Sequence, residues 1–288
     1  MSQPVIVITG AHGALGSAVA RAAGEAGWSV AAVDHADKGD LPGAALTLCG
    51  VDLTDADQAG KAMKTVADRL GRIDALLNIA GGFVWQTLED GDPAAWGRMH
   101  ALNVTTAMNA SRAALPFLKQ APDGRIVNVG AAGAQKAAAG MGAYAASKAG
   151  VHRLTESLAE ELKDSTVTVN AVLPSIIDTP ANRADMGEEN ADKWVKPADL
   201  AAVMAQTRPV TGIRAPVTAR AAGEARNSMT AARSAGLTHL SAFFSPMSAR
   251  LAAVSMMEGR TALTVTAPSL SSSARDSVRR WTPALEAA

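Results

Sequence analysis

Short runs of branched apolar residues alternate with helix-length amphipathic segments through the first 218 residues of this 288-residue chain. Apolar runs of this length without polar alternation are typical of strands that are buried on both faces of a parallel sheet. Strands separated by helices predict an α/β fold with a doubly wound parallel sheet and right-handed crossovers. The expected strands are residues 5–9, 29–34, 45–51, 73–79, 125–130 and 166–172.

Two of the expected helices have recognisable ends. One begins at Thr54, an N-cap residue type, and ends at Gly71, which can adopt the left-handed conformation that closes helices. The other begins at Asp92-Pro93, an N-cap followed by a favourable first residue, and runs to about Lys119. Helices of this length fit the crossovers of a parallel sheet.

Composition excludes several classes of function. The 27 basic and 27 acidic side chains cancel, so no global basic field attracts nucleic acid or anionic lipid. Cys49 is the only cysteine and the five histidines are scattered, which argues against disulfides and metal sites. Neither a basic leader nor a run of 18 apolar residues occurs. We therefore expect a soluble, cytoplasmic protein without nucleic-acid or membrane partners.

The alternating pattern weakens after residue 218. Residues 219–288 contain eight arginines but no lysine or isoleucine. We therefore expect a main domain at residues 1–218 and a C-terminal extension at 219–288. The extension is either a flexible or loosely helical segment, or the product of a reading frame that differs from an intact relative's. Residues 213–218 form a candidate last strand, and 237–257 a candidate apolar helix.

A glycine-rich turn joins the first expected strand to a helix. Glycines at 10, 13 and 16 would allow a sharp turn, close approach to a pyrophosphate and tight packing of helix on strand. The N–H groups at the start of the helix would face the phosphates. Such a turn can also be purely structural, but its position between strand and helix is the one that dinucleotide binding requires. The segment is Thr9-Gly10-Ala11-His12-Gly13-Ala14-Leu15-Gly16.

Two acidic residues follow the next two strands. Asp34 ends the second strand, where a carboxylate can accept hydrogen bonds from the ribose diol and would repel a 2′-phosphate. NAD(H) is therefore favoured over NADP(H), although Lys38 or a relaxed loop could accommodate the phosphate. Asp52, beside Leu53, could bond an adenine amino group or could simply cap the next helix.

Tyr144 and Lys148 stand four residues apart in a segment with helical apolar periodicity. This spacing places both side chains on one helix face, where the cation can stabilise phenolate and lower the pKa of the tyrosine. Such a pair can transfer protons. The same spacing also occurs where a half-buried ring lies beside a solvated amine.

In this order along the chain, the motifs resemble those of the short-chain dehydrogenase/reductase family over about residues 4–218. The resemblance also rests on Asn78-Ile79-Ala80-Gly81 after the fourth strand, Asn103 in the long helix, and residues 174–180 after the sixth strand. It implies a Rossmann fold, a nicotinamide cofactor, a small carbonyl or alcohol substrate, and a homo-oligomer, either dimer or tetramer.

The resemblance also assigns roles to individual residues. Tyr144 would be the acid/base, and Lys148 would lower its pKa and bind the nicotinamide ribose. Asn103 would hold a water that relays protons to Lys148, Thr179 would contact the carboxamide, and residues 182–194 would form a lid. The expected cofactor contacts are Gly10, His12, Gly13, Ala14, Leu15, Gly16, Asp34, Asp52, Leu53, Asn78, Ala80, Gly81, Tyr144, Lys148, Pro174, Ile177 and Thr179.

Three positions depart from the family's common pattern. Ala14 replaces a frequent glycine, Ser175 follows Pro174 where glycine is usual, and Ala131 stands where the substrate-orienting serine is expected, 13 residues before Tyr144. Loss of one oxyanion donor typically costs about 100- to 1,000-fold in turnover, so chemistry can survive.

Three functions remain open. The first is an NAD(H)-dependent oxidoreductase acting on a carbonyl/alcohol pair. The second is a quinonoid reductase similar to dihydropteridine reductase, a branch of the family that works without the serine. The third is a nucleotide-binding sensor or scaffold with little catalysis.

Overall fold

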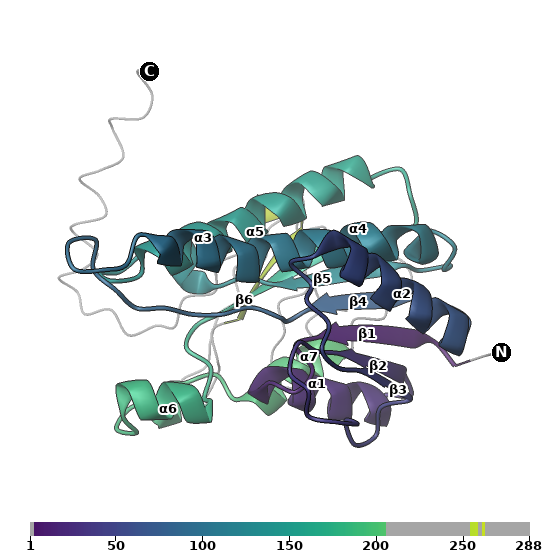
Figure 1. Cartoon of the computed structure of the whole chain (residues 1–288), viewed down its shortest axis with the longest axis horizontal. Helices are drawn as coiled ribbons and strands as arrows, with labels where there is room; N and C mark the ends of the chain where they lie inside the picture. Colours follow the sequence, from purple (N-terminus) through teal and green to yellow (C-terminus); the bar gives the residue numbers. More distant parts are fainter. Residues whose placement is uncertain (1–2, 206–253, 259–260, 263–288) are drawn as a thin grey trace, which may run out of the picture.

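The computed structural model describes residues 3–205, 254–258 and 261–262 (Figure 1). Within these residues the strands form one eight-stranded sheet in the order β3-β2-β1-β4-β5-β6-β7-β8. The first six pair in parallel, whereas β7 runs antiparallel to both β6 and β8. The strands are β1 Val5–Thr9, β2 Ser29–Val33, β3 Leu46–Leu48, β4 Ala75–Asn78, β5 Arg125–Val129, β6 Thr168–Pro174, β7 Val254–Glu258 and β8 Thr261–Ala262.

Helices cover both faces of the parallel part of the sheet (Figure 1). The α-helices are α1 Ala14–Glu25, α2 Ala56–Leu70, α3 Ala94–His100, α4 Thr106–Leu118, α5 Gly142–Glu161, α6 Pro180–Met186 and α7 Pro197–Ala205. Figure 1 shows α1 and α7 on one face and α2, α4 and α5 on the other. A doubly wound Rossmann fold is therefore confirmed.

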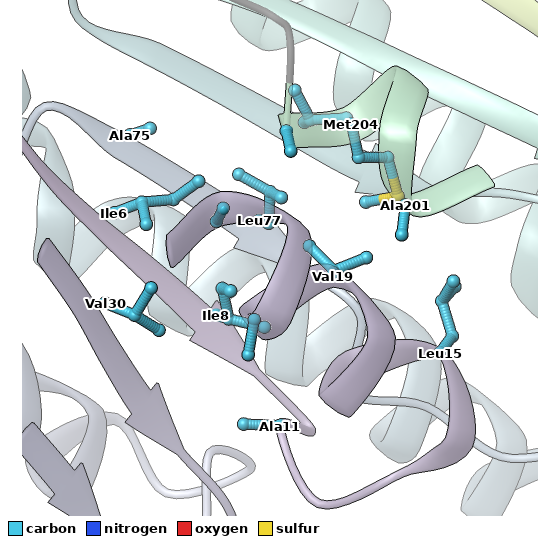
Figure 2. Close-up of a cluster of buried hydrophobic side chains, with 14 of the residues drawn as sticks. Ile6, Ile8, Ala11, Leu15, Val19, Val30, Ala75, Leu77, Ala201 and Met204 are labelled. Carbon is cyan, nitrogen blue, oxygen red and sulfur yellow. The ribbon is translucent and has the colours of Figure 1, made fainter. Parts of the chain in front are cut away.

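The two faces bury separate hydrophobic clusters because the strands are apolar on both sides. On the α1 face, Ile6 and Ile8 of β1 pack with Leu77 of β4, Val19 of α1 and Met204 of α7 (Figure 2). On the other face, alternate residues of the same strands meet α2 and α4. Alternation along β1 thus fixes the central strand between the two helical layers.

The strand order places the topological switch between β1 and β4. From β1 the chain winds outwards to β2 and β3, and it then returns to β4 on the other side. Loops after β1 and β4 therefore diverge to opposite faces at the carboxyl edge of the sheet. This is the position at which open α/β sheets bind ligands.

Several element boundaries differ from those expected. Asp55, rather than Thr54, caps α2: its side chain accepts hydrogen bonds from the N–H groups of Asp57 and Gln58. The long helix expected from residue 92 is interrupted by a π-helical segment, Ala101–Thr105. Residues 182–194, which the resemblance assigns to a lid, contain most of α6 and a short 3₁₀ turn, Ala191–Lys193.

The expected apolar helix at 237–257 is wrong where it can be examined. Residues 254–257 lie in β7, which pairs with β6. The rest of that segment, the candidate strand at 213–218 and the proposed domain boundary at 218 lie outside the described residues.

Candidate active site

The glycine turn closes tightly against the loop after β4. Gly10 has φ +64°, and a Cβ there would lie 2.9 Å from the backbone of Ala80. A Cβ at Gly16 would lie only 2.1 Å from the Gly10 carbonyl oxygen. Gly13 is the N-cap of α1 and provides no side-chain cap, so backbone donors at this helix end are open to a ligand. These residues fit a dinucleotide.

Asp34 lies beside this turn, at the end of β2. One of its oxygens accepts a hydrogen bond of 2.8 Å from the N–H of His12, and the other accepts one of 2.8 Å from the N–H of Ala36. The carboxylate is thereby held against the glycine turn. It keeps further lone pairs that could accept hydrogen bonds from a ribose diol.

Asp52 and Leu53 have structural contacts. The Asp52 carboxylate accepts hydrogen bonds from the hydroxyl and the N–H of Thr54, and these bonds lower its pKa below the ordinary value. Leu53 is buried in the core, and its carbonyl accepts a hydrogen bond from Asn109. Their contact with adenine stays a prediction.

Tyr144 and Lys148 come from the first half of α5 and face the carboxyl edge of the sheet. The Lys148 ammonium is buried and donates a 2.8 Å hydrogen bond to the carbonyl of Val129, and burial lowers its pKa to about 8. Burial also raises the pKa of Tyr144 to about 12. This is opposite to the direction that we expected from Lys148. The ring of Phe83 contacts Tyr144 edge-on, with 4.9 Å between ring centroids.

Asn103 lies in the π-helical segment and is 1% exposed. Its side-chain oxygen accepts from the N–H of Gly82 at 3.0 Å, and its amide donates to the Gly82 carbonyl at 3.1 Å and to the Ser147 hydroxyl at 2.9 Å. It thus joins the loop after β4 to α5. π-Helical turns often occur at functional sites because the extra residue redirects a side chain.

Gly81 brings these groups to one point. A Cβ at Gly81 would lie 2.4 Å from the Asn103 side-chain oxygen and 3.5 Å from the Lys148 ammonium nitrogen. Any side chain there would therefore displace Asn103. The bare backbone therefore leaves room for the Asn103 side chain, while the Lys148 ammonium lies at ordinary contact distance from the same position.

Asn78 is directed away from this edge. Its buried amide donates hydrogen bonds to Asn128 at 2.8 Å and to Ser111 at 3.0 Å. Asn128 in turn donates to Thr155 of α5 at 2.9 Å. The side chain therefore ties β4 to β5, α4 and α5, and only its backbone neighbours approach the glycine turn.

His152 belongs to the site's surroundings, although nothing in the sequence analysis singled it out. It follows Lys148 by one helical turn, and this spacing was the available signal. Its Nε2 accepts a hydrogen bond of 3.4 Å from the N–H of Ala131, and a Cβ at Gly130 would lie 2.5 Å from the same nitrogen. Burial, followed by the charges of Arg153 and Lys148, lowers its pKa to about 4. His152 thus supports the loop that carries Ala131.

The segment after β6 is held by a charge cluster that sequence analysis also missed. Thr179 caps α6 through a 3.1 Å bond from the N–H of Asn182, while Ile177 bridges to Val195. Asp178 accepts hydrogen bonds from Arg183 and Lys196, which hold its pKa far below the ordinary value. Contacts of Pro174, Ile177 and Thr179 with a cofactor stay predictions.

Residues 3–205 and the two short later ranges contain no group of three or more side chains suited to a metal ion. None of the helices described there is long and apolar enough to cross a bilayer.

Comparison with known proteins agrees with this geometry. The family model described as short chain dehydrogenase matches residues 4–190. A cis-4-hydroxycyclohexanecarboxylate dehydrogenase of Sinomonas cyclohexanicum is 32% identical, covering 75% of this chain and 85% of its own.

Two solved structures are similar over 71% of this chain. A 3-ketoacyl-(acyl-carrier-protein) reductase from Brucella melitensis, complexed with NADH, has a TM-score of 0.64 at 25% identity, with 90% of its chain covered. A short chain dehydrogenase from Burkholderia cenocepacia J2315, in complex with NADP, has a TM-score of 0.65 at 29% identity, with 89% covered. This chain therefore belongs to the short-chain dehydrogenase/reductase family of oxidoreductases.

Proposed function

We propose that the protein is an NAD(H)-dependent dehydrogenase or reductase that acts on a small secondary alcohol or the corresponding carbonyl, with Tyr144 as acid/base. The observation that carries the proposal is the convergence at Gly81, whose bare backbone leaves room for the Asn103 side chain beside the Lys148 ammonium. A protein that only binds a nucleotide has no need of that convergence.

The residues present suit a nicotinamide dinucleotide. The glycine turn and the uncapped start of α1 would hold the pyrophosphate, Asp34 the adenosine ribose, and Lys148 the nicotinamide ribose. When bound, the nicotinamide would supply hydride exchange with the reacting carbon. All other steps are performed by the protein's side chains.

Tyr144 moves the proton. With its pKa raised to about 12 by burial, the phenol keeps its proton at neutral pH and can donate it to a carbonyl oxygen during reduction. In oxidation the phenol must accept the alcohol's proton after losing its own. A Lys148 ammonium that faces the phenolate would favour this deprotonated form, because opposite charges stabilise each other.

Ala131 leaves one side of the reacting oxygen without a hydroxyl donor. Removal of such a donor typically costs about 100- to 1,000-fold in turnover. We therefore propose an enzyme that turns over simple alcohols slowly and retains proton transfer by Tyr144.

The exposed aromatic Trp85 donates a hydrogen bond to the carbonyl of Ala139 and brings the loop after β4 to the residues before α5. Together with Phe83 it supports an apolar substrate.

Asp34 supports the choice of NAD(H) over NADP(H). A carboxylate beside the adenosine ribose accepts hydrogen bonds from the diol and repels a 2′-phosphate. The two similar structures differ in this respect, since one is complexed with NADH and the other with NADP. Asp34 is the residue of this chain that favours the former.

The test combines binding with turnover. Titration of NADH fluorescence should give the same affinity for the native protein and Tyr144→Phe, since the hydroxyl is the only group removed. Turnover of a panel that includes cyclohexanol, 4-hydroxycyclohexanecarboxylate and 3-hydroxybutyrate should fall by about 100- to 10,000-fold in the variant, the usual contribution of general acid–base catalysis. Equal turnover in both proteins would refute the role of Tyr144.

Because Ala131 carries no hydroxyl, two alternative functions are considered. A quinonoid dihydropterin needs less help at one oxygen, so a dihydropteridine-reductase-like activity would appear as turnover of that substrate but not of the alcohols. A sensor or scaffold would bind NADH with no turnover in either the native protein or Tyr144→Phe.

We also propose that copies of the chain assemble into a dimer or tetramer. Trp96, Leu102 and Met108 are exposed apolar side chains along α3, the π-helical segment and α4, and exposed apolar side chains that gather on a surface often mark an interface. Light scattering coupled to size exclusion would show a monomer if this proposal is wrong. A cytoplasmic location remains a proposal as well.

A further inference from the structure

The two ring nitrogens of His12 differ: Nε2 makes a hydrogen bond and Nδ1 makes none. The side chain is 8% exposed, and its Nε2 lies 3.0 Å from the carbonyl oxygen of Gly39. A carbonyl can only accept a hydrogen bond, so Nε2 must carry a proton. The buried Nδ1 has no hydrogen-bond partner. The charge of the ring is therefore decided at Nδ1.

Asp34 is the group that Nδ1 faces. The nearer carboxylate oxygen lies 3.7 Å from Nδ1, and the same oxygen accepts the backbone hydrogen bond from His12. A neutral imidazole would direct a lone pair towards this anion, whereas an imidazolium would direct an N–H towards it. Protonation of Nδ1 would thus place a positive charge directly against Asp34 in a partly buried position.

Other charged residues lie in the loops that follow β2 and β3. They are His35, Asp37, Lys38 and Asp40 from the first loop and Asp52 from the second. Lys38 and Asp40 flank Gly39 with opposite charges and are exposed, so their effects on the ring largely cancel and are screened by solvent. Cys49 contributes a 3.3 Å hydrogen bond to the same Gly39 carbonyl. The first turn of α1 carries no acid.

We infer that His12 sets the negative charge that Asp34 presents to the adenosine ribose, and so makes discrimination between NAD(H) and NADP(H) depend on pH. The inference rests on the proposed dinucleotide function. With His12 neutral, Asp34 repels a 2′-phosphate with its full charge. With His12 protonated, the pair is neutral and the phosphate is tolerated. Selectivity for NAD(H) therefore increases as the pH rises.

The test measures binding alone. Dissociation constants for NADH and NADPH are determined by fluorescence from about pH 5.5 to 8.5 for the native protein, His12→Gln and the matched control His35→Gln. Glutamine can still donate to Gly39 but does not titrate, and His35 is an exposed neighbour. The 2′-phosphate has its own ionisation near pH 6, which contributes to all three proteins alike.

The quantity compared is the NADPH dissociation constant divided by the NADH dissociation constant. From the lowest to the highest pH, this ratio should rise about tenfold more in the native protein and in His35→Gln than in His12→Gln. One charge beside an anion typically changes the interactions of that anion by at least this factor. Equal pH dependence in His12→Gln would overturn the inference and leave the proposed function intact. Failure of the native protein to bind either dinucleotide would overturn both.

A second measurement avoids the variant if His12→Gln fails to fold. Nuclear magnetic resonance of the ring nitrogens in the native protein should show Nδ1 gaining a proton as the pH falls, while Nε2 stays protonated. NADPH should move the midpoint of this change to higher pH, and NADH should not. An Nδ1 that stays unprotonated throughout the range would overturn the inference.

Discussion

Acid should destabilise the folded protein through His152. The ring is 3% exposed and burial lowers its pKa from 6.5 to about 4. The unfolded chain takes up a proton near pH 6.5, whereas the folded protein does so only near pH 4. Between these values the unfolded state binds more protons than the folded state. The free energy of unfolding therefore decreases as the pH is lowered. At about 1.4 kcal/mol per pKa unit, the loss attributable to His152 is about 3 kcal/mol.

The assay is urea unfolding at pH 7.5 and pH 4.5 for the native protein, His152→Gln and His100→Gln. Glutamine is neutral at both pH values, and the exposed His100 is the control for loss of a histidine. Protonation of carboxylates weakens all three proteins in acid, so the informative quantity is the difference in acid loss. That loss should be smaller by about 2 to 3 kcal/mol in His152→Gln. Equal losses in all three proteins would refute the assigned burial of the neutral ring.

Three further substitutions test the site. Gly16→Ala should weaken NADH binding by about tenfold, because the new Cβ would lie 2.1 Å from the Gly10 carbonyl and overpacking costs about 1 to 3 kcal/mol. Gly24→Ala, in open space on the same helix, is the control in the fluorescence titration. Equal NADH affinities for the two variants would contradict binding of the dinucleotide at the glycine turn. Asn103→Ala should lower the free energy of unfolding in urea by about 1 to 3 kcal/mol by leaving buried polar groups unpaired, and an unchanged value would show that its bonds to Gly82 and Ser147 are not formed. Ala131→Ser should raise turnover of alcohols by up to about 100-fold by restoring an oxyanion donor; steady-state rates that do not change would mean that the reacting oxygen does not approach residue 131.

Much of the fold followed from periodicity alone. The run from Val5 to Thr9 is apolar at every position because both of its faces are covered by helices, and its bounds were predicted correctly. The short β3 was overestimated because residues 45 and 49–51 are also apolar or small, although they lie outside the strand. The N-cap of α2 was misplaced by one residue. Thr54 and Asp55 are both good caps, but the Thr54 hydroxyl donates to the nearby Asp52 carboxylate and Asp55 caps the helix.

The site was only partly accessible from sequence. Spacing placed Tyr144 and Lys148 on one face of α5, but burial, which decides their pKa values, depends on the loops that cover them. The partners of Asn103 could not be predicted, because they depend on a π-helical turn that has no simple sequence pattern. His152 was missed for a different reason: it matters through its contact with Gly130, which is distant along the chain.

The π-helical turn fixes the number of residues between α3 and α4. Each residue advances a helix by about 100°, so deletion of one residue from Ala101–Thr105 would rotate everything before it relative to everything after it. Met99 of α3 and Ala107 of α4 are both buried, and a regular helix of one residue fewer would turn one of them towards solvent. Insertions and deletions should therefore be rare at this point among related chains, even where the amino acids themselves vary.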